Sequence, residues 1–355
     1  MKNNMLLAAL LCLGSQAGMV SAADAQTAPQ RWYKGNTHAH SSNSRGGDTA
    51  PDALARWYRE HGYQFVFITD HDEYLTDVAP INALLGRRDW FLVLPGQENG
   101  QRINRKDGSR GEVHINALFS NEVIISTRGG TTIEGTIAPV LAQGAIAQVN
   151  HPNYLWSMTP ADFDNVPDGT LLEVWNGGGG INNLGGDDGK GDVRPSAEGY
   201  WDYLLSRGKI IWATGADDSH VFKGEAATDP DDFGPGRAWI MVRAPELTPA
   251  ALKTAIQKGD FYASTGVTLT DIVVDANGVE VTIAPTKANP RYLTRFIGQD
   301  GKVLSEVAGL KPSYRFTGSE TYVRASIIDS NGKRAWGQPV FRDNRTQRNS
   351  FGATR

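Results

Sequence analysis

The sequence predicts an α/β protein: a seven-stranded (β/α) TIM-like barrel, closed or nearly closed, followed by a small C-terminal β-sandwich. The first observation is that seven short apolar segments alternate with helical patterns between residues 31 and 267. Continuous apolar strands in such an alternation are typical of parallel βα units that are covered on both faces. The second observation is that the pattern then changes to short strands of alternating polarity, which turn sequences separate.

The predicted barrel elements follow one another along the chain. The first helix, Pro51–His61, begins with a proline and an aspartate and ends just before Gly62, as helix-boundary preferences require. Ala251–Lys258 is predicted as the last helix, and an additional pair of strands, Val113–Phe119 and Val123–Ser126, interrupts the alternation. The barrel strands are predicted at Trp32–Thr37, Phe65–Thr69, Trp90–Leu94, Ala145–Val149, Leu171–Trp175, Ile210–Ala213 and Ala238–Val242, and Phe261–Gly266 closes the region.

Residues 268–343 are predicted to form the β-sandwich, and the polar tail, residues 344–355, is predicted to fray. Turn sequences such as Asn277-Gly278 and Asn331-Gly332 separate its strands. These strands are predicted at Asp271–Val274, Val279–Ile283, Tyr292–Gly298, Tyr314–Phe316, Tyr322–Asp329 and Pro339–Phe341.

The first 22 residues are predicted to be a cleavable signal peptide. Lys2 precedes the apolar run Met5–Leu13, and small residues end the segment at Ala22. A membrane anchor would need roughly 20 continuous apolar residues, about twice the length of this run. We therefore expect a periplasmic or secreted protein with no membrane anchor after cleavage. The single cysteine, Cys12, would leave with this segment.

The composition excludes several kinds of site. The 355 residues carry a formal net charge of −4, which does not suit a protein that binds nucleic acid through a basic surface. One cysteine excludes an internal disulfide, a zinc-finger thiolate cluster and an iron–sulfur site. Any metal ion must therefore be held by histidines and carboxylates.

Six of the seven histidines follow predicted strands or lie on the additional pair. The carboxyl ends of barrel strands converge on one mouth, which is where the chemistry of such folds is found. Glu98 follows the third strand and Asp218 follows the sixth, so both carboxylates face the same mouth. The seventh histidine, His61, lies near a helix end, where a cation is favourable, and we assign it no function. The six are His38, His40, His71, His114, His151 and His220.

The sequence His38-Ala39-His40 is the most informative of these motifs. Alternate residues of a strand point to the same side, so the two imidazoles share a face. Burying them is costly without a metal or other partners. An isolated histidine is most often a surface or hydrogen-bonded structural residue, but four more histidines and two carboxylates at neighbouring strand ends favour metal binding. These nitrogen and oxygen ligands suit Zn, Mn or Fe and do not choose among them.

Six motifs occur in order along the chain: GNTHAH (35–40), ITDHD (68–72), GQEN (96–99), VHINAL (113–118), NHP (150–152) and GADDSH (215–220). Together they resemble the PHP (polymerase and histidinol phosphatase) metallohydrolase family, and within it the exported CehA/McbA-type, carbaryl-hydrolase-like branch. The resemblance extends over residues 31–343. It implies a distorted seven-stranded barrel, the PHP fold, with two or three divalent metal ions at the strand ends.

The resemblance also implies which residues hold each ion. The ligands of the first ion would be His38, His40, Glu98 and Asp218. Glu98 would bridge to a second ion, whose other ligands would be His114 and His151. His71 and His220 would serve a third ion or hydrogen-bond the bound solvent, and either could protonate the leaving group. Asp70 is expected to orient a ligand, and Asp217 is a weaker candidate than Asp218 because only Asp218 keeps the Asp-x-His spacing.

The segment Ser44–Asp48 departs from the pattern of the family. Relatives with a third metal usually place an Asp or His shortly after His-x-His, whereas this chain has Arg45 there. Either Asp48 takes over as a metal ligand, or the third site is weakened. Arg45 would then clamp an anionic substrate with its guanidinium. The alternative is that Arg45 is a solvated loop residue.

The segment Asn176–Asp192, which contains the sequence NGGGG, follows the fifth predicted strand. It lacks the pattern of a phosphate-binding P-loop. We expect either a substrate lid or a disordered connector, and Asn176 is the candidate for a polar contact with the substrate.

The leading functional hypothesis is a metal-dependent phosphoesterase, in which a metal-bound hydroxide attacks a small, anionic ester substrate. The alternative is hydrolysis of a carboxyl ester or carbamate by the same metals, and the second alternative is a non-catalytic, metal-stabilised binding module. Cations near the mouth would favour a phosphate, whereas an apolar, Trp-lined pocket would favour an aryl carbamate. The amidohydrolase superfamily also has His-x-His, but Glu98 on the third strand argues against it. The oligomeric state is not predicted.

Overall fold

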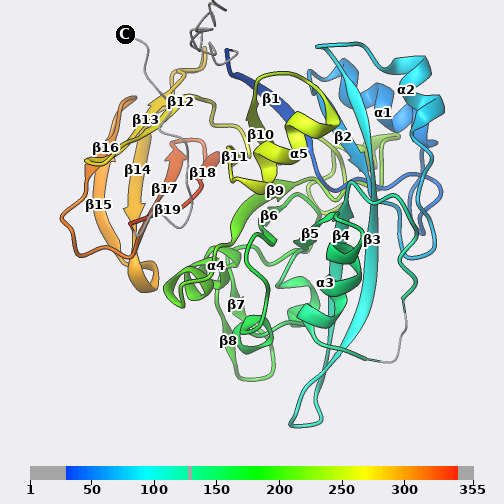
Figure 1. Ribbon diagram of the computed structural model, residues 1–355, viewed down its shortest axis with the longest axis horizontal. Helices are drawn as coiled ribbons and strands as arrows, with labels where there is room; N and C mark the ends of the chain where they lie inside the picture. Colours follow the sequence, from blue (N-terminus) through cyan, green and yellow to red (C-terminus); the bar gives the residue numbers. More distant parts are fainter. Residues whose placement is uncertain (1–28, 127–129, 343–355) are drawn as a thin grey trace, which may run out of the picture.

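The computed structural model describes residues 29–126 and 130–342 (Figure 1). The predicted signal peptide at residues 1–22 and the predicted polar tail at residues 344–355 lie outside the described residues. In the described part of the chain, no helix has the length and apolar character needed to cross a membrane.

The helices connect successive strands of the first 260 residues. Helix α1 begins at a proline, Pro51, which suits the first turn because the missing N–H would have no partner there. It buries Leu54, Ala55 and Tyr58 along one face. The α-helices are α1 (Pro51–Glu60), α2 (Ala79–Leu85), α3 (Ile133–Ala142), α4 (Ala197–Ser206) and α5 (Pro249–Gln257); the short 3-10 helices are η1 (Tyr154–Trp156), η2 (Pro160–Phe163), η3 (Glu225–Ala227) and η4 (Gln299–Gly301).

Within the described residues, the strands belong to one large sheet and two small ones. In the first region they are β1 (Arg31–Asn36), β2 (Phe65–Ile68), β3 (Leu92–Asn104), β4 (Arg110–Leu118), β5 (Ile146–Val149), β6 (Leu171–Asn176), β7 (Gly186–Asp187), β8 (Val193–Arg194), β9 (Trp212–Ala216), β10 (Trp239–Ala244) and β11 (Phe261–Ser264). In the C-terminal region they are β12 (Leu269–Val274), β13 (Gly278–Ile283), β14 (Tyr292–Ile297), β15 (Val303–Ala308), β16 (Ser313–Arg315), β17 (Tyr322–Asp329), β18 (Arg334–Gly337) and β19 (Val340–Phe341).

The large sheet is mixed, and this corrects the prediction of parallel βα units throughout. Strands β1, β2 and β3 are parallel to one another, and so are β5, β6 and β9. Strand β4 is antiparallel to both β3 and β5, and β10 is antiparallel to β1. A continuous apolar run identifies a buried strand but carries no information about its direction, which is why the prediction failed here.

The additional pair of strands also differs from the prediction. Residues 113–118 lie in β4 as expected, but Val123–Ser126 does not form a strand. The partner of β4 is the long strand β3, with a register that runs from Gly96 opposite Leu118 to Asn104 opposite Arg110. The amides of Gln97 and Asn99 donate to the carbonyl of Ile124, so side chains, rather than a strand ladder, hold this segment.

The ladder of the barrel region runs from β10 through β1 to β9, and within the described residues β9 pairs only with β6. Strand β9 nevertheless lies against the opposite edge of this arc, because a Cβ at Gly215 would be 3.6 Å from the Cβ atoms of Ala238 and Ala263. The segments that follow β1 and β9 are also hydrogen-bonded, with His40 N donating to Ser219 O at 2.8 Å. These contacts bring the carboxyl ends of distant strands together.

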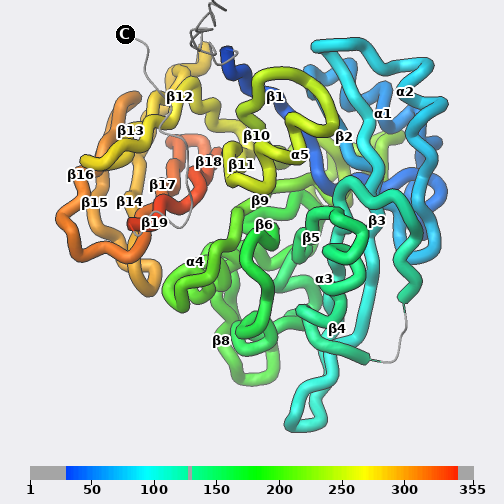
Figure 2. Tube along the Cα trace, viewed as in Figure 1, coloured from blue at the N-terminus to red at the C-terminus, as the bar shows by residue number. Residues whose placement is uncertain are grey.

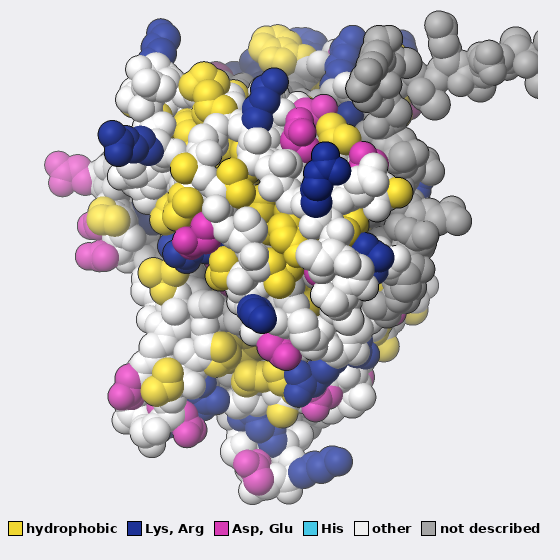
Figure 3. Space-filling view, turned by 90° about the vertical axis from the view of Figure 1, so that its left-hand side faces the viewer, with side chains coloured by type: hydrophobic (Ala, Val, Ile, Leu, Met, Phe, Trp, Pro, Cys, Tyr) yellow, Lys and Arg dark blue, Asp and Glu magenta, His cyan; other side chains and the backbone are white. Residues whose placement is uncertain are grey.

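The C-terminal region is not a separate sandwich, because one of its two sheets continues the large sheet. Strand β18 pairs with β11, and β17, β14 and β15 extend the sheet from there. The other sheet contains β12, β13 and β16. Val281, Phe296 and Ile327 pack between them, together with Tyr262 of β11. Figure 2 shows the chain of this region beside the barrel region, and Figure 3 shows its outer face, where Lys and Arg side chains are interspersed with Asp and Glu.

A buried ion network fixes the C-terminal region against helix α4. The Arg324 guanidinium of β17 lies 2.6 Å from Asp202 Oδ2 and 2.8 Å from Glu198 Oε2. Only 2% of Arg324 is exposed, so both charges of each pair are largely removed from water. Separating the partners of such a network would leave uncompensated buried charges. Because that is costly, the network holds the C-terminal region firmly against α4.

Candidate metal centre

The segments after the strands place four side chains around one buried point. His38 and His40 follow β1, Glu98 lies on β3, and Asp218 follows β9. The Nε2 atom of His38 lies 3.3 Å from Glu98 Oε1 and 3.1 Å from Asp218 Oδ1, and the Nε2 atom of His40 lies 3.3 Å from a carboxylate oxygen of each acid. One ligand atom from each of these residues lies within 4.8 Å of all the others. We call this group the carboxylate floor.

Glu98 belongs to a second group as well. Its Oε1 atom lies 3.2 Å from His114 Nδ1 and 3.4 Å from His151 Nε2. His114 comes from β4 and His151 from the segment after β5, so the antiparallel insertion in the sheet supplies one ligand of this group. A carboxylate shared between two groups is the arrangement that allows two cations to sit side by side.

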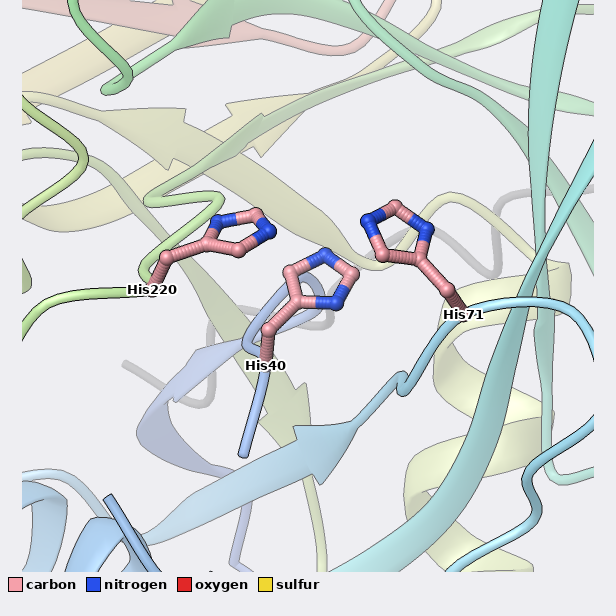
Figure 4. A group of neighbouring side chains, drawn as sticks. All are labelled: His40, His71 and His220. Carbon is pink, nitrogen blue, oxygen red and sulfur yellow. The ribbon is translucent and has the colours of Figure 1, made fainter. Parts of the chain in front are cut away.

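The third group consists of His40, His71 and His220, whose rings converge from three different segments (Figure 4). The ring centroid of His40 lies 4.0 Å from that of His220 and 4.3 Å from that of His71. No carboxylate belongs to this group among the described residues, although His71 Nδ1 lies 3.0 Å from Glu98 Oε2. We call it the all-histidine group.

The unpartnered atoms of the floor fit bound cations. Nε2 of His38, Nε2 of His40 and Oε2 of Glu98 are buried and have no hydrogen-bond partner among the described residues. Buried polar atoms in proteins are almost always paired, so three orphaned lone-pair donors that face one point require an explanation. A divalent cation supplies it, because imidazole nitrogens and carboxylate oxygens are ligands that Zn, Mn and Fe accept. The three groups are consistent with a multinuclear metal site.

The electrostatics of the site favour cations. Burial alone would raise the pKa of Glu98, but the neighbouring His38, His71 and His114 hold it well below the usual value. Burial would also raise the pKa of Asp218, but His38, His40 and other imidazoles outweigh it and lower this pKa. Both acids are therefore charged at neutral pH. Burial and the nearby His40 lower the pKa of His220 to about 4, which keeps this imidazole neutral and able to act as a ligand.

Glu173 is a supporting residue that the sequence reasoning missed. It lies on β6, fully buried, and its Oε1 atom is 2.8 Å from His38 Nδ1. Its Oε2 atom accepts hydrogen bonds from the backbone N–H of His151 and from the amide of Asn176. A carboxylate on Nδ1 keeps the proton there and turns the Nε2 lone pair of His38 toward the floor. An acid within the apolar run of residues 171–175 was the available signal.

Asp70 supports the site through Ser44. Its carboxylate accepts hydrogen bonds from the hydroxyls of Ser41, Ser44 and Thr76. The Ser44 hydroxyl lies 3.0 Å from His40 Nδ1 and accepts the backbone N–H of His71 at 2.8 Å. Asp70 therefore orients His40 indirectly, through the Ser44 hydroxyl.

Asp217, by contrast, fixes the fold next to the site. Its carboxylate accepts hydrogen bonds from Tyr58 and from three backbone N–H groups at residues 236–238. This pins the end of β9 to the start of β10. The next residue, Asp218, has a φ of 53°, and His151 has a φ of 26°, so two candidate ligands hold conformations that non-glycine residues rarely adopt. Such strain is concentrated at functional sites.

The three groups open into a cavity of about 320 Å³. It is lined by the candidate ligands His71, Glu98, His114, His151, Asp218 and His220, and by Gly46, Tyr154, Val221, Asp232 and Phe233. Neither a lysine nor an arginine lines it among the described residues. The size suits a small-molecule substrate.

Arg45 and Asp48 both take positions outside the metal groups. Arg45 is exposed and does not line the cavity, although its neighbour Gly46 does. The carboxylate of Asp48 accepts the backbone N–H groups of Phe222 and Lys223, so it holds the segment after His220.

Asn176 is buried, and its side chain is fully engaged by the protein. Its amide nitrogen donates to Glu173 Oε2 at 2.9 Å and to Asp218 Oδ2 at 3.2 Å, and its Oδ1 accepts the N–H of Gly178. We therefore assign it to the support of Asp218 in place of the expected substrate contact.

No family model and no curated protein matches the sequence. Among solved structures, the chain is similar to a two-domain protein from Bacteroides vulgatus that contains a predicted PHP-like metal-dependent phosphoesterase, with 15% identity, a TM-score of 0.46, and coverage of 85% of this chain and 92% of that one. It is also similar to the lesion-specific endonuclease EndoQ of Pyrococcus furiosus, with 12% identity, a TM-score of 0.38, and coverage of 64% and 56%. Likeness at this level does not decide a function.

Proposed function

We propose that the protein is a metal-dependent hydrolase of small esters, with phosphoesters as its leading substrate class. One observation carries this proposal: the buried carboxylate of Glu98 belongs to two ligand groups at once, beneath a cavity of small-molecule size. Two cations held by one bridging acid match the requirement of a displacement in which an attacking and a leaving oxygen must both be stabilised.

The side chains of this protein would hold the metal ions, orient the ligands and protonate the leaving group. When bound, divalent cations would polarise the scissile ester and lower the pKa of a water molecule. Glu173 fixes the tautomer of His38, and the Asn150 amide donates to Glu98 Oε1 at 2.8 Å, which orients the shared carboxylate. The side chains of His71 and His220 are 27% and 16% exposed at the cavity. Burial opposes a charged His71, but Glu98 outweighs it and raises the pKa of this imidazole, so His71 would be the proton donor to the leaving group. His220, with a pKa of about 4, would stay neutral.

The sequence motifs support a finer assignment within this proposal. They favour the PHP family and its CehA/McbA-type branch, a site of two or three Zn, Mn or Fe ions, and a periplasmic or secreted location. The approach of β9 to β10 and β11 at Gly215 supports a distorted barrel that side-chain packing closes.

A second candidate is the hydrolysis of carboxyl esters or carbamates by the same centre. The walls of the cavity favour it, because Tyr154, Val221 and Phe233 are largely apolar and no lysine or arginine lines the cavity in the described chain. A phosphate would have to be neutralised by the metal ions alone. The cavity therefore admits either electrophile.

The experiment that tests the proposal uses the full chain loaded with Zn, Mn or Fe, with bound metal measured first. Hydrolysis is then compared for an aryl phosphomonoester, an aryl phosphodiester, an aryl acetate and an aryl carbamate. We expect metal-dependent turnover that is fastest with one of the phosphoesters. Preference for the acetate or the carbamate would establish the second candidate instead. Full metal occupancy without turnover of any of the four would favour a non-catalytic binding module.

A further inference from the structure

Two neighbouring residues, Asp232 and Phe233, form part of the wall of the cavity. They belong to the segment between η3 and β10. The Phe233 ring stands edge-on to the ring of His220, with centroids 5.5 Å apart. The wall is therefore in direct contact with the all-histidine group, and a substrate at the metal centre must lie against it.

The protein holds this wall rigidly from behind. Arg237 donates to the backbone carbonyls of Asp229, Asp232 and Gly177, so one guanidinium ties the segment to the loop after β6. Asp217 fixes the far end by accepting the N–H groups of Gly236 and Arg237. Residues 229–237 are thus held in a fixed position, and Asp232 and Phe233 of this segment line the cavity.

The glycine run 177–180 explains how the two loops can meet. A Cβ at Gly178 would lie 2.3 Å from the Phe233 ring, and a Cβ at Gly179 would lie 2.1 Å from the carbonyl oxygen of Asp231. The N–H of Gly179 donates to the carbonyl of Asp232 at 3.1 Å. These glycines are required for the close packing that sets the position of the wall, which gives the NGGGG sequence a role other than a lid.

The carboxylate of Asp232 is not neutralised by the protein. Its Oδ1 accepts the N–H of Phe233, and it forms no ion pair with any described residue. The other acids that line the cavity are Glu98 and Asp218, whose charges the metal ions would offset. Asp232 is therefore a carboxylate without an ion pair on a half-buried wall, where charges interact more strongly than in bulk water. The nearby Arg237 guanidinium is engaged by backbone carbonyls instead.

We infer that the Asp232–Phe233 wall selects substrates by the charge of the group that lies against it: it favours esters that carry a neutral or cationic group there and rejects those that carry a second anionic group. The inference rests on the proposed hydrolysis at the adjacent metal centre. Specificity of this kind comes from a repulsive element, since a second anion would have to approach Asp232 without a counter-charge.

The test compares the metal-loaded wild type with Asp232→Asn, and uses Asp231→Asn as the matched control. Asp231 is the neighbouring acid, is exposed, and does not line the cavity. The substrates are phosphomonoesters of three alcohols of similar size that carry a trimethylammonium group, a hydroxyl group or a carboxylate. We expect the wild type to have a higher kcat/KM for the cationic ester than for the carboxylated ester. Asp232→Asn should reduce the ratio of these two values about tenfold and change kcat/KM for the hydroxyl ester less than about twofold. Asp231→Asn should change the ratio less than about twofold.

A binding measurement separates this inference from the proposed function. Ligand-observed NMR compares tetramethylammonium with acetate on the same metal-loaded proteins, and needs no turnover. Loss of the preference for tetramethylammonium in Asp232→Asn alone would support the wall as a charge filter even if no ester were hydrolysed. Equal effects of Asp232→Asn on all three esters and on both ions, with unchanged metal content and melting temperature, would overturn the inference.

Discussion

The carboxylate floor and the all-histidine group share His40 but differ in almost every physical respect. In the floor, the side chains of His38, His40, Glu98 and Asp218 are at most 5% exposed, and two of the four carry a negative charge. In the all-histidine group, His71 and His220 are 27% and 16% exposed, and no acid contributes a ligand atom. The floor is also braced by Glu173 and Asn176, whereas His220 Nδ1 contacts only the backbone carbonyl of Asp218 among its hydrogen bonds in the described residues.

The carboxylate floor and the all-histidine group are therefore not equivalent metal sites. Anionic ligands and fixed ligand geometry both raise the affinity for a divalent cation, and the floor has both. A neutral set of three imidazoles at the cavity wall binds a cation more weakly and exchanges it more readily. We therefore expect the floor to be occupied permanently and the all-histidine group to be occupied in proportion to free metal.

The largest expected effect comes from Glu98, which belongs both to the carboxylate floor and to the group with His114 and His151. Glu98→Gln removes the bridging charge and should release both ions that depend on it, with activity reduced by more than about 100-fold, beyond the range of supporting residues. His220→Ala should lose only the weakest ion. Elemental analysis of dialysed protein checks both, and retention of two ions by Glu98→Gln would contradict the division into floor and all-histidine group.

A smaller effect is expected from the support of the floor. Glu173→Gln keeps the shape of the side chain but removes the carboxylate from His38 Nδ1, and such supporting changes typically cost about 10–100-fold in metal affinity. The matched control is Glu225→Gln, an exposed acid on η3. Competition with a chelator measures the affinity of each variant. Equal affinities for Glu173→Gln and the wild type would show that the floor does not depend on its bracing.

The floor could be predicted from the sequence because its residues lie on or just after strands that apolar runs reveal. The His38–His40 spacing, for instance, places both rings on one face of an extended segment. Glu173 could not be found this way, since its partner His38 is distant in the sequence and β2, β3, β4 and β5 separate their strands in the sheet.

The fold was predicted less completely, for two physical reasons. Residues 95–104 form most of β3 although they are mostly polar, because their buried side chains such as Gln97 find hydrogen-bond partners inside the protein. The direction of β10 depends on which sheet edge was free, and hydrophobic periodicity does not encode that. Likewise, the continuation of the large sheet from β11 into β18 is a long-range pairing that no local pattern specifies.

The dependence of stability on pH should distinguish the metal-free floor from the loaded one. Burial opposes a charged His38, but Asp218, Glu98 and Glu173 outweigh it and raise its pKa well above 6.5. In metal-free protein, the stabilisation by this imidazolium is complete below the unfolded pKa of about 6.5 and is lost as pH rises through the raised folded pKa. Bound cations require neutral imidazole, so they stabilise most where the protons are lost.

We therefore expect the melting temperature of chelator-treated protein to fall by several degrees between pH 6 and pH 9, while the metal-loaded protein changes less. Scanning calorimetry of both forms across this range measures the difference. A metal-free protein that became more stable toward pH 9 would contradict the assignment of the His38 charge.

The smallest effect is expected at Arg45, which the family comparison suggested as a substitute for the charge of a third ion. Because the side chain is exposed and does not line the cavity, solvent screens its field, and Arg45→Ala should change kcat/KM for an aryl phosphate by less than about threefold. Measurement at low and at saturating free metal makes the test sharper. If Arg45 replaces the third ion, the loss should exceed tenfold at low metal and disappear when the all-histidine group is filled. If the arginine is only a solvated loop residue, metal concentration should not alter its effect, and the all-histidine group alone would then set the charge at the open side of the centre.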